Sequence, residues 1–324
     1  MKIRKILFLL VSFFIFSTAL AEDKNKKDLP LVAVSQIVEH PALNEIYRGF
    51  LEELAKLGYK DGENIRLSYR IAQGDNGLNS QIAQQFAGQK PAVVVAITTP
   101  SAQAAIASAH GKFPILFTGI SDPVGAGLVS NLEQPGANVS GVMENLAFRE
   151  NLDAIAELIP DVKAIGTVYN PSEDNSNSTN AELTKICTER GWKFIAAPAK
   201  NTGEVLEAAR SLIGKVDAIL ITLDNTAVAA FPSISNIATQ SNIPVFTFDT
   251  FSAEYAAVAI GYDEAEVGRL TARQAAEVLQ GKAVGEIPVA KVQTIRIVIN
   301  EKLAAAQKLQ IPENIRKKAN EIIK

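Results

Sequence analysis

Polar side chains that can hold a charged or hydrogen-bonding molecule gather in short segments, each of which directly follows an apolar run. They are hydroxyls, amides, carboxylates and one imidazole, which can donate or accept hydrogen bonds and can carry charge of either sign. Such a set suits reversible binding of a small polar molecule. The candidate ligand-binding residues are Gln36, His40, Thr98, Thr99, Ser101, Ser121, Asp122, Asn170, Ser176, Asn177, Asp224, Asn225, Thr226 and Asp249.

Two of these hydroxyl residues, Thr99 and Ser101, lie at the expected start of a helix over residues 101–109. The first backbone N–H groups of a helix have no partners within it, and the helix dipole favours an anion there. A ligand carboxylate therefore fits this position. Alternatively, each hydroxyl only caps its own helix, and the same two interpretations apply to Thr226 and Ser176.

Three aspartates, Asp122, Asp224 and Asp249, each end an expected strand. A carboxylate in such a place can accept charge-assisted hydrogen bonds from a ligand ammonium group. The alternative is a turn or capping role, above all for Asp122, which precedes Pro123. Asn170 can add neutral hydrogen bonds or simply belong to a solvated loop.

His40 and Asn177 are further candidates for ligand contact, although His40 has no obvious partner in the sequence. An apolar or aromatic part of a ligand needs apolar side chains to fill the remaining cleft. The aromatic residues that can line it, or can equally be plain core, are Phe148, Phe251 and Tyr255.

Catalytic and metal-binding patterns are absent from the sequence. His40 and His110 are the two histidines, and the setting of His110 before Gly111 is typical of a helix C-terminus. The sequence contains no G-x-S-x-G elbow, no H-E-x-x-H pair, no Walker loop and no cluster of cysteine and histidine ligands. We therefore expect neither an enzyme nor a cofactor or metal; a hydrolase on a similar scaffold is the less favoured alternative.

The elements that must position these residues alternate between strand and helix patterns. Short apolar runs rich in β-branched residues, separated by amphipathic stretches, predict parallel sheets covered by helices. In the first half the expected strands are 31–34, 65–69, 92–97 and 114–117, and the expected helices are 44–57, 78–86 and 101–109. Ligands bind beyond the carboxyl ends of such strands, where the polar segments lie.

The same order of elements returns in the second half of the chain. Its expected strands are 164–169, 194–196, 217–222 and 244–247, with helices over 177–190, 203–213 and 227–240. The expected fold class is therefore α/β, with two Rossmann-like lobes that are each built on a parallel sheet. We expect one lobe to hold residues 30–143 plus about 250–280, and the other to hold residues 146–247 plus about 285–324.

Length and composition agree with two ordinary globular lobes. The chain has 324 residues, of which 47% are hydrophobic and 21% charged, and its formal net charge is -3. At about 100–200 residues per domain, this length suggests two domains. The charge does not indicate a nucleic-acid binder, which would carry a strongly basic patch. Few aromatic residues, 6% of the chain, argue weakly against a sugar ligand.

The first 21 residues have the pattern of a cleavable secretory signal peptide. Lys2, Arg4 and Lys5 precede an apolar run over residues 6–16, and Ala19 and Ala21 form an A-x-A site. An uncleaved anchor is the alternative. The one cysteine, Cys187, lies in a helical pattern and is expected to be a small buried residue. Because the residue directly after the cleavage point is Glu22 and not the cysteine that a lipid anchor needs, we expect a free periplasmic protein and not a lipoprotein.

Several segments resemble one family, the ABC-transporter substrate-binding proteins that include tryptophan- and tyrosine-binding members. The resemblance covers roughly residues 30–300, and the segments that carry it are 38–43, 73–75, 96–104, 121–129, 169–171 and 222–226. Among them, S-D-P-V-G-A-G-L-V (121–129) and D-N-T (224–226) are distinctive together. Many members of that family are lipoproteins, but this chain lacks the lipid-accepting cysteine after its signal-like segment.

This resemblance implies a type I periplasmic-binding-protein fold, in which two lobes with parallel sheets are joined by three crossovers and a hinge and close around the ligand. It implies a small-molecule ligand such as an aromatic amino acid, and a membrane permease with an ATPase as partners. We expect a monomer with no nucleic-acid partner. The alternatives are a binding protein for a sugar or a branched-chain amino acid, and the ligand-sensing domain of a receptor.

Overall fold

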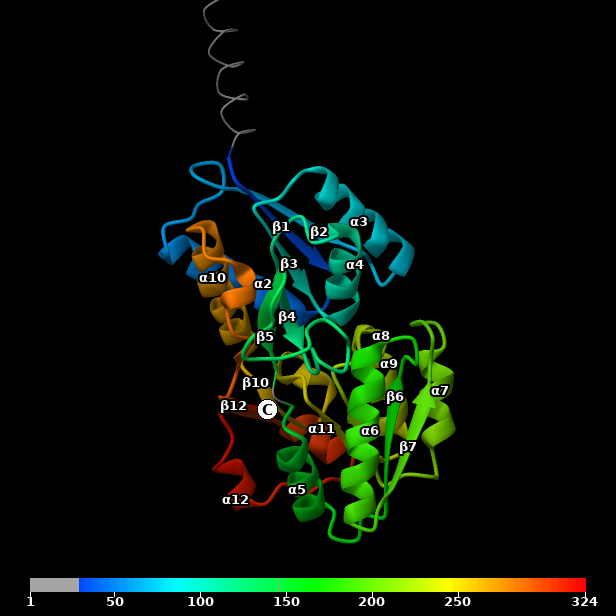
Figure 1. The fold of residues 1–324 in the computed structure, drawn as a ribbon. Coiled ribbons are helices and arrows are strands. Elements are labelled where there is room, and N and C mark those ends of the chain that lie inside the picture. The colour runs from blue at the N-terminus through cyan, green and yellow to red at the C-terminus, as the bar shows by residue number, and fades with distance from the viewer. Residues whose placement is uncertain (1–28, 145) are drawn as a thin grey trace, which may run out of the picture.

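The computed structural model describes residues 29–144 and 146–324, which form two α/β lobes stacked end to end (Figure 1). The expected signal peptide, residues 1–21, lies outside the described residues. In the part of the chain that is described, no helix has the length and apolarity that crossing a bilayer requires.

The first lobe is built on a six-stranded sheet in the order β11-β5-β4-β3-β1-β2, in which every pair is parallel. Helices α2 and α10 pack together on one face of this sheet, and α3 and α4 on the other (Figure 1). Its strands are β1 (Leu31–Gln36), β2 (Arg66–Ile71), β3 (Val93–Ile97), β4 (Ile115–Ile120), β5 (Val139–Met143) and β11 (Ala290–Lys291). Its helices are α2 (Pro41–Lys56), α3 (Asn76–Gly88), α4 (Thr99–Ala109), the 3-10 turn Val284–Glu286 and α10 (Glu264–Leu279).

The second lobe is built on a seven-stranded sheet in the order β13-β12-β10-β9-β8-β6-β7, in which only the β10–β12 pair is antiparallel. Its strands are β6 (Ala164–Tyr169), β7 (Lys193–Pro198), β8 (Ala218–Ile221), β9 (Val245–Thr247), β10 (Val258–Tyr262), β12 (Ile295–Asn300) and β13 (Glu321–Ile323). Its helices are α5 (Phe148–Leu158), α6 (Asp174–Glu189), α7 (Val205–Leu212), α8 (Asn225–Ala229), α9 (Phe231–Gln240), the 3-10 turn Thr250–Tyr255, α11 (Glu301–Ala306) and α12 (Glu313–Arg316).

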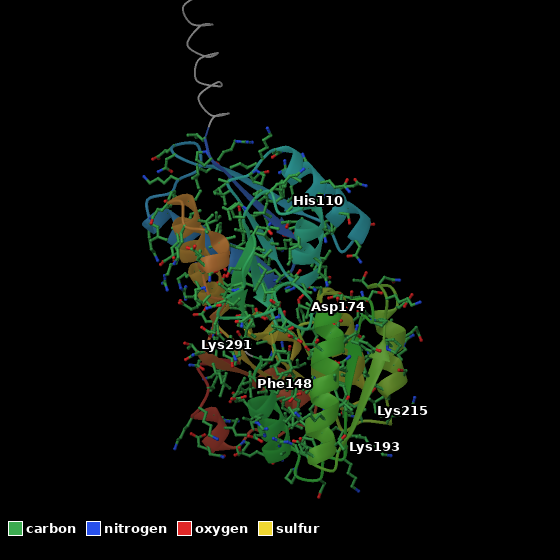
Figure 2. The ribbon with its side chains drawn as sticks, viewed as in Figure 1. His110, Phe148, Asp174, Lys193, Lys215 and Lys291 are labelled. Carbon is green, nitrogen blue, oxygen red and sulfur yellow. The ribbon has the colours of Figure 1, made fainter. Side chains whose placement is uncertain are left out.

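The expected fold class, two α/β lobes with mostly parallel sheets, is confirmed. Local expectations also agree with the structure. Cys187 is buried on α6, and His110 ends α4 in a left-handed conformation with φ 47°. Figure 2 places His110 on the first lobe, well away from the second.

The chain passes between the two sheets three times, and we call these passages the crossing segments. They join β5 to α5, β10 to α10, and β11 to β12. The segment expected to return to the first lobe near residue 250 stays in the second, because β10 pairs in parallel with β9 through Val258 and Phe246. The segment expected to enter the second lobe near residue 285 first adds Ala290 to β5 in the first lobe.

Helices α2 and α10 pack so closely that two glycines are needed. A Cβ atom on Gly49 would stand 2.2 Å from the carbonyl oxygen of Ala265, and one on Gly268 would stand 2.0 Å from that of Ile46. No real Cβ atom sits at such distances from backbone, so a larger residue would push the helices apart. Since α10 begins at the second crossing segment, this contact also fixes where that segment enters the first lobe.

Substituting Gly268→Ala should lower the free energy of unfolding by about 1–3 kcal/mol, because the added methyl group overpacks the α2–α10 contact. Gly88→Ala is the matched control: Gly88 is also helical, and its Cβ would meet nothing within 4 Å. The control should be neutral or slightly stabilising. Chemical denaturation of both variants measures the difference, and equal stability of the two would contradict the close packing.

Candidate ligand-binding site

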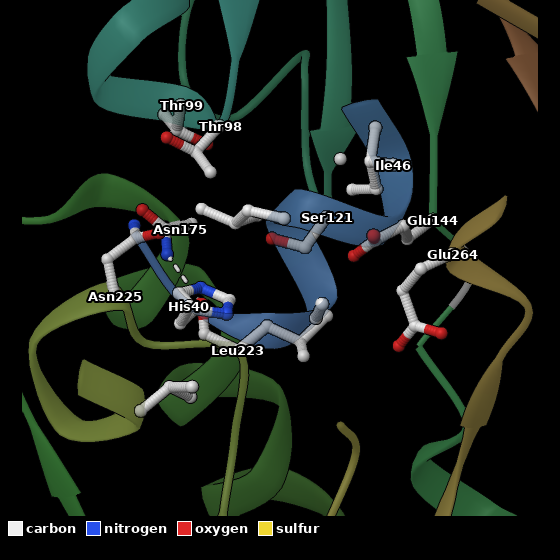
Figure 3. A pocket seen from close by; sticks show the side chains of 14 residues that line it. His40, Ile46, Thr98, Thr99, Ser121, Glu144, Asn175, Leu223, Asn225 and Glu264 are labelled. Carbon is white, nitrogen blue, oxygen red and sulfur yellow. Dashed lines mark hydrogen bonds between the residues drawn. The ribbon is translucent and has the colours of Figure 1, made fainter. Parts of the chain in front are cut away.

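The carboxyl ends of the strands in the two sheets face each other across a cavity of about 470 Å³ (Figure 3). Both lobes and two crossing segments contribute to the lining. The lining residues are His40, Ala42, Leu43, Ile46, Thr98, Thr99, Gly119, Ser121, Glu144, Asn175, Leu223, Asn225, Val228 and Glu264.

Two helices of the first lobe begin at this cavity without a side-chain cap. Helix α2 starts after His40, and α4 starts after Thr98, and neither side chain accepts a hydrogen bond from its own helix. Thr98 has φ 81°, a conformation that costs free energy for a β-branched residue and is typical of functional sites. The uncapped N–H groups and helix dipoles give this side of the cavity a positive potential that suits an anion.

Several buried polar atoms around the cavity have no hydrogen-bond partner within the described residues. They are Nδ1 of His40, Oγ1 of Thr98, Oγ of Ser121 and Oδ1 of Asn175. A buried polar atom without a partner costs about 1–3 kcal/mol, and most such atoms in native proteins are satisfied. Their gathering around one cavity indicates that a bound molecule supplies the partners.

Burial lowers the pKa of His40, against the opposing effect of the nearby negative charge of Asp249. The imidazole therefore favours its neutral form, in which it can donate one hydrogen bond and accept another. His40 can contact either a donor or an acceptor on a ligand.

The opposite side of the cavity is acidic. Glu144 follows β5 and Glu264 begins α10, so each lies on a crossing segment. Burial, and then the charge of Asp249, raise the pKa of Glu144 to about 7. Burial, followed by the charges of Asp249 and Glu144, raises the pKa of Glu264 well above its usual value. This side of the cavity therefore favours a proton or a cation.

A smaller cavity of about 230 Å³ adjoins this acidic side. Glu144, Leu223 and Glu264 line both cavities. The other walls of the smaller one are apolar or aromatic: Leu146, Ala147, Phe248, Gly261 and Tyr262. An apolar group that passes between the two glutamates would find a hydrophobic environment here.

The aromatic residues suggested by the sequence line neither cavity. Phe148 packs edge-on against Phe248 with ring centroids 5.5 Å apart, and Figure 2 shows it on the second lobe. Phe251 lies beneath the guanidinium of Arg296, and Tyr255 packs against Phe231 in the core. They form core and surface contacts, because helix α5 and the turn after β9 direct them away from the cavity.

Asp224 serves its own lobe. Its buried carboxylate accepts hydrogen bonds from the backbone N–H of Asn170 (2.6 Å), the hydroxyl of Ser176 (2.6 Å) and the backbone N–H of Ala227 (2.6 Å). It therefore caps α8 and ties the loop after β6 to the loop after β8. Asp224 is not among the residues that line the cavity, so the expected contact between Asp224 and a ligand ammonium is not what this geometry provides.

A second buried carboxylate, Glu173, organises the same loops and was not singled out in the sequence. It accepts hydrogen bonds from the side chain of Asn225 (2.6 Å) and the hydroxyl of Thr226 (3.0 Å). Burial, and then the charge of Asp224, raise the pKa of Glu173 to about 7. Asn170 donates to Thr226 at 2.9 Å, so these residues form one network. They also line a more open groove of about 790 Å³ between the lobes.

Asp249 is buried and caps the 3-10 turn that follows β9. It accepts from the backbone N–H groups of Phe251 (2.9 Å) and Ser252 (3.1 Å), and from the hydroxyl of Ser252. It lines neither cavity, so direct contact with a ligand ammonium is not what this geometry provides. Its charge nevertheless reaches the site, since it acts on Glu144, Glu264 and His40.

The other candidate residues lie outside the two cavities. Gln36 donates to the carbonyl of Val38 and accepts from the hydroxyl of Tyr69 (2.7 Å). Ser101 is buried against Asn79, and Asp122 accepts from the backbone N–H of Gly125 (2.8 Å). Exposed Asn177 donates to the carbonyl of Pro171. The candidates that do line the main cavity are His40, Thr98, Thr99, Ser121 and Asn225.

Glu144 and Glu264 were missed in the sequence because neither follows a recognisable strand pattern. Glu144 falls where Gly141 interrupts the apolar pattern of the first half, and Glu264 is the first residue of α10. The sequence could have indicated each glutamate as a carboxylate next to a boundary between the lobes. The position of the second boundary follows only from the pairing of β10 with β9 in the second sheet.

Comparison with known proteins decides the family. The sequence profile of the family described as "ABC transporter substrate binding protein" matches residues 31–323. The chain belongs to this family. Its members are substrate-binding proteins, so the expectation that the chain is not an enzyme is confirmed by the family and its relatives.

Three relatives of this substrate-binding protein are similar to it over most of its length, and two of them are described with an amino acid ligand. A tyrosine-binding protein of Clostridioides difficile (strain R20291) is 38% identical over 280 residues, which is 86% of this chain and 81% of the relative. A domain from Streptococcus pneumonia, solved in complex with L-Trp, is 32% identical with a TM-score of 0.87 over 91% of this chain and 100% of that one. A ligand-free, open substrate-binding protein from Clostridium difficile is 35% identical with a TM-score of 0.68 over 91% and 99%.

Substituting Asp224→Ala in the substrate-binding protein should lower the free energy of unfolding by about 2–4 kcal/mol, because it removes a helix cap and leaves buried donors unpaired. Asp161→Ala, at an exposed position, is the control and should change stability by less than about 0.5 kcal/mol. Urea denaturation measures both. A D224A variant that unfolds like the wild type but no longer binds ligand would make Asp224 a ligand contact instead.

Glu144 should make the stability of the ligand-free protein depend on pH. Its pKa is about 7 in the folded state and near 4.5 when exposed, so the cost of ionising it appears as the pH rises from about 4.5 through 7. Glu144→Gln removes that cost. The stability gained by E144Q over the wild type should therefore grow between pH 5 and pH 8, by on the order of 3 kcal/mol at most. Denaturation at several pH values measures it, and a constant difference would contradict the raised pKa.

Proposed function

We propose that this substrate-binding protein captures an aromatic amino acid between its two lobes and presents it to the permease and ATPase of an ABC importer. The observation that carries the proposal is a cavity lined by both lobes, with uncapped helix N-termini on one side and buried carboxyl groups on the other. An amino acid carries the complementary pair of charges. The relatives named for tyrosine and solved with L-Trp support an aromatic side chain.

The ligand carboxylate is placed at the starts of α2 and α4. There, backbone N–H groups of the first helical turns and the unpartnered hydroxyl of Thr98 can donate to it. Thr99 and Ser121 also line the cavity. The aromatic side chain is placed toward the smaller cavity, whose walls include Phe248 and Tyr262.

Hinge closure on the ligand is part of the proposal. The similarity in shape supports it: the TM-score is 0.87 to the L-Trp complex but 0.68 to the open, ligand-free structure, although the latter is slightly more identical in sequence. A hydrogen bond between Gln103 on α4 and Asp174 on α6, 2.7 Å long, joins the two lobes in the present arrangement. Figure 2 shows Asp174 at the end of α6 that faces the first lobe.

We also infer that the protein is exported, released by cleavage after Ala21, and acts as a monomer in the periplasm. The basis is the signal-like pattern of residues 1–21 and the fact that no cysteine comes directly after it in the sequence. The expected partners are a small-molecule ligand and the two membrane-associated components of the importer.

A ligand screen tests the function. Residues 22–324 are purified, and their melting temperature is measured with each of the twenty amino acids and with common sugars. Ligand at about 100 times its Kd stabilises the folded state by about 2.7 kcal/mol, which raises the melting temperature by several degrees. We expect shifts with tyrosine, tryptophan or phenylalanine. Shifts only with sugars or with branched-chain amino acids would overturn the proposal.

A further inference from the structure

We propose that Glu144 and Glu264 together form the receptor for a protonated amine of the ligand, and that this amine links two crossing segments when the lobes close. The proposal deepens the function proposed above by naming the residues that select the ligand's charged group. The sequence suggested aspartates for this role, and the geometry points to the two glutamates instead.

The position of the two side chains is the first argument. Glu144 directly follows β5 and Glu264 opens α10, so they belong to different crossing segments and meet between the lobes. They are 7% and 4% exposed, and both line the main cavity and the smaller one. Figure 3 shows both across the cavity from Thr98 and Thr99. A group held between them is therefore bound by both segments at once.

The uncompensated charge is the second argument. The negative charges of Asp249 and Glu144 both act on Glu264, so three carboxyl groups influence one another in a buried place. Among the described residues that line the two cavities there is no lysine or arginine. Buried carboxylates are normally paired or protonated. A ligand ammonium supplies the missing positive charge and donates up to three hydrogen bonds.

Unpartnered polar atoms elsewhere in the same cavity are independent support for a ligand. Oγ1 of Thr98 and Oδ1 of Asn175 are buried without partners, and these residues are 4% and 6% exposed. Thr98 lies beside the start of α4, where an anion is favoured, and the glutamates lie across from it. The cavity is thus polarised for a molecule with a negative group at one end and a positive group at the other.

Binding of an ammonium should release protons from this cluster. Burial holds Glu144 partly protonated near neutral pH, with a pKa of about 7. A neighbouring cation favours the carboxylate, so the ligand lowers that pKa and a proton leaves. Asp249 and Glu264 oppose the ionisation of Glu144, and protonation of His40 at low pH would repel the ligand cation. Affinity should therefore rise between pH 5 and pH 7.5 and then level off.

The experiment compares three ligand series by isothermal titration calorimetry. The first is L-tyrosine, L-tryptophan and L-phenylalanine; the second is the amines tyramine, tryptamine and phenethylamine; the third is the corresponding des-amino propionic acids. The protein forms are the wild type, Glu144→Gln, Glu264→Gln and the control Glu150→Gln, an exposed glutamate on α5. Melting temperatures establish that each variant is folded.

We expect the ligands that bind the wild type to carry an amine, and their des-amino counterparts to bind roughly 30-fold or more weakly. E144Q and E264Q should weaken the amine-bearing ligands by a similar factor, and E150Q should leave them unchanged. Titrations near pH 6.5 in two buffers of different ionisation enthalpy should show proton release by the wild type, and less by E144Q.

The outcomes separate this proposal from the function on which it rests. If amino acids and des-amino acids bind equally and both glutamine variants bind like the wild type, the glutamates are not the receptor while the binding function stands. If amines bind and amino acids do not, the receptor stands and the proposed ligand is wrong. Binding of none of the three series would overturn both.

Discussion

Where the carboxyl ends of the two sheets meet, polar groups on both sides are taken out of water, and each of them needs a partner. For two buried carboxylates of the second lobe, the protein supplies these partners itself. Asp224 and Glu173 are saturated by hydrogen bonds from neighbouring loops and helix starts. Around the central cavity, in contrast, Nδ1 of His40 and Oγ1 of Thr98 have no partner among the described residues. This difference separates the framework of the site from its binding surface.

Carboxyl groups illustrate the same division. Burial raises the pKa of both Asp224 and Glu144, but Asp224 accepts three short hydrogen bonds that oppose this rise and fix two loops. For Glu144 the causes that act on the pKa are burial and the nearby charge of Asp249, and both make its ionisation less favourable. A charge that the framework leaves uncompensated is the one that a ligand can compensate. The carboxylates of the framework and those that line the cavity thus differ in their partners and not in their burial.

The crossing segments join these local features to the behaviour of the whole molecule. Glu264 begins α10, which packs on α2 through Gly268 and Gly49, and α2 in turn begins at His40 in the cavity. One rigid helix pair therefore carries residues from both sides of the site. A ligand that contacts these residues also contacts the elements on which any movement between the lobes must turn, which is how binding and closure can share free energy.

The sequence by itself determined the α/β class, the two similar halves and the segments in which polar residues would gather. These follow from local periodicity and from the rule that parallel strands present their carboxyl ends at one edge, and they placed His40, Thr98, Thr99, Ser121 and Asn225 correctly at the cavity. Only the tertiary structure decided which carboxylates line the cavity. Asp224 and Asp249 look alike in sequence to a ligand-binding aspartate, but Asp224 accepts long-range hydrogen bonds from Asn170 and Ser176, and Asp249 caps the turn that follows it. Glu144 and Glu264 become neighbours only because β10 pairs within the second sheet and sends the chain back beside β5. Such pairing depends on contacts between distant residues, which no local pattern encodes.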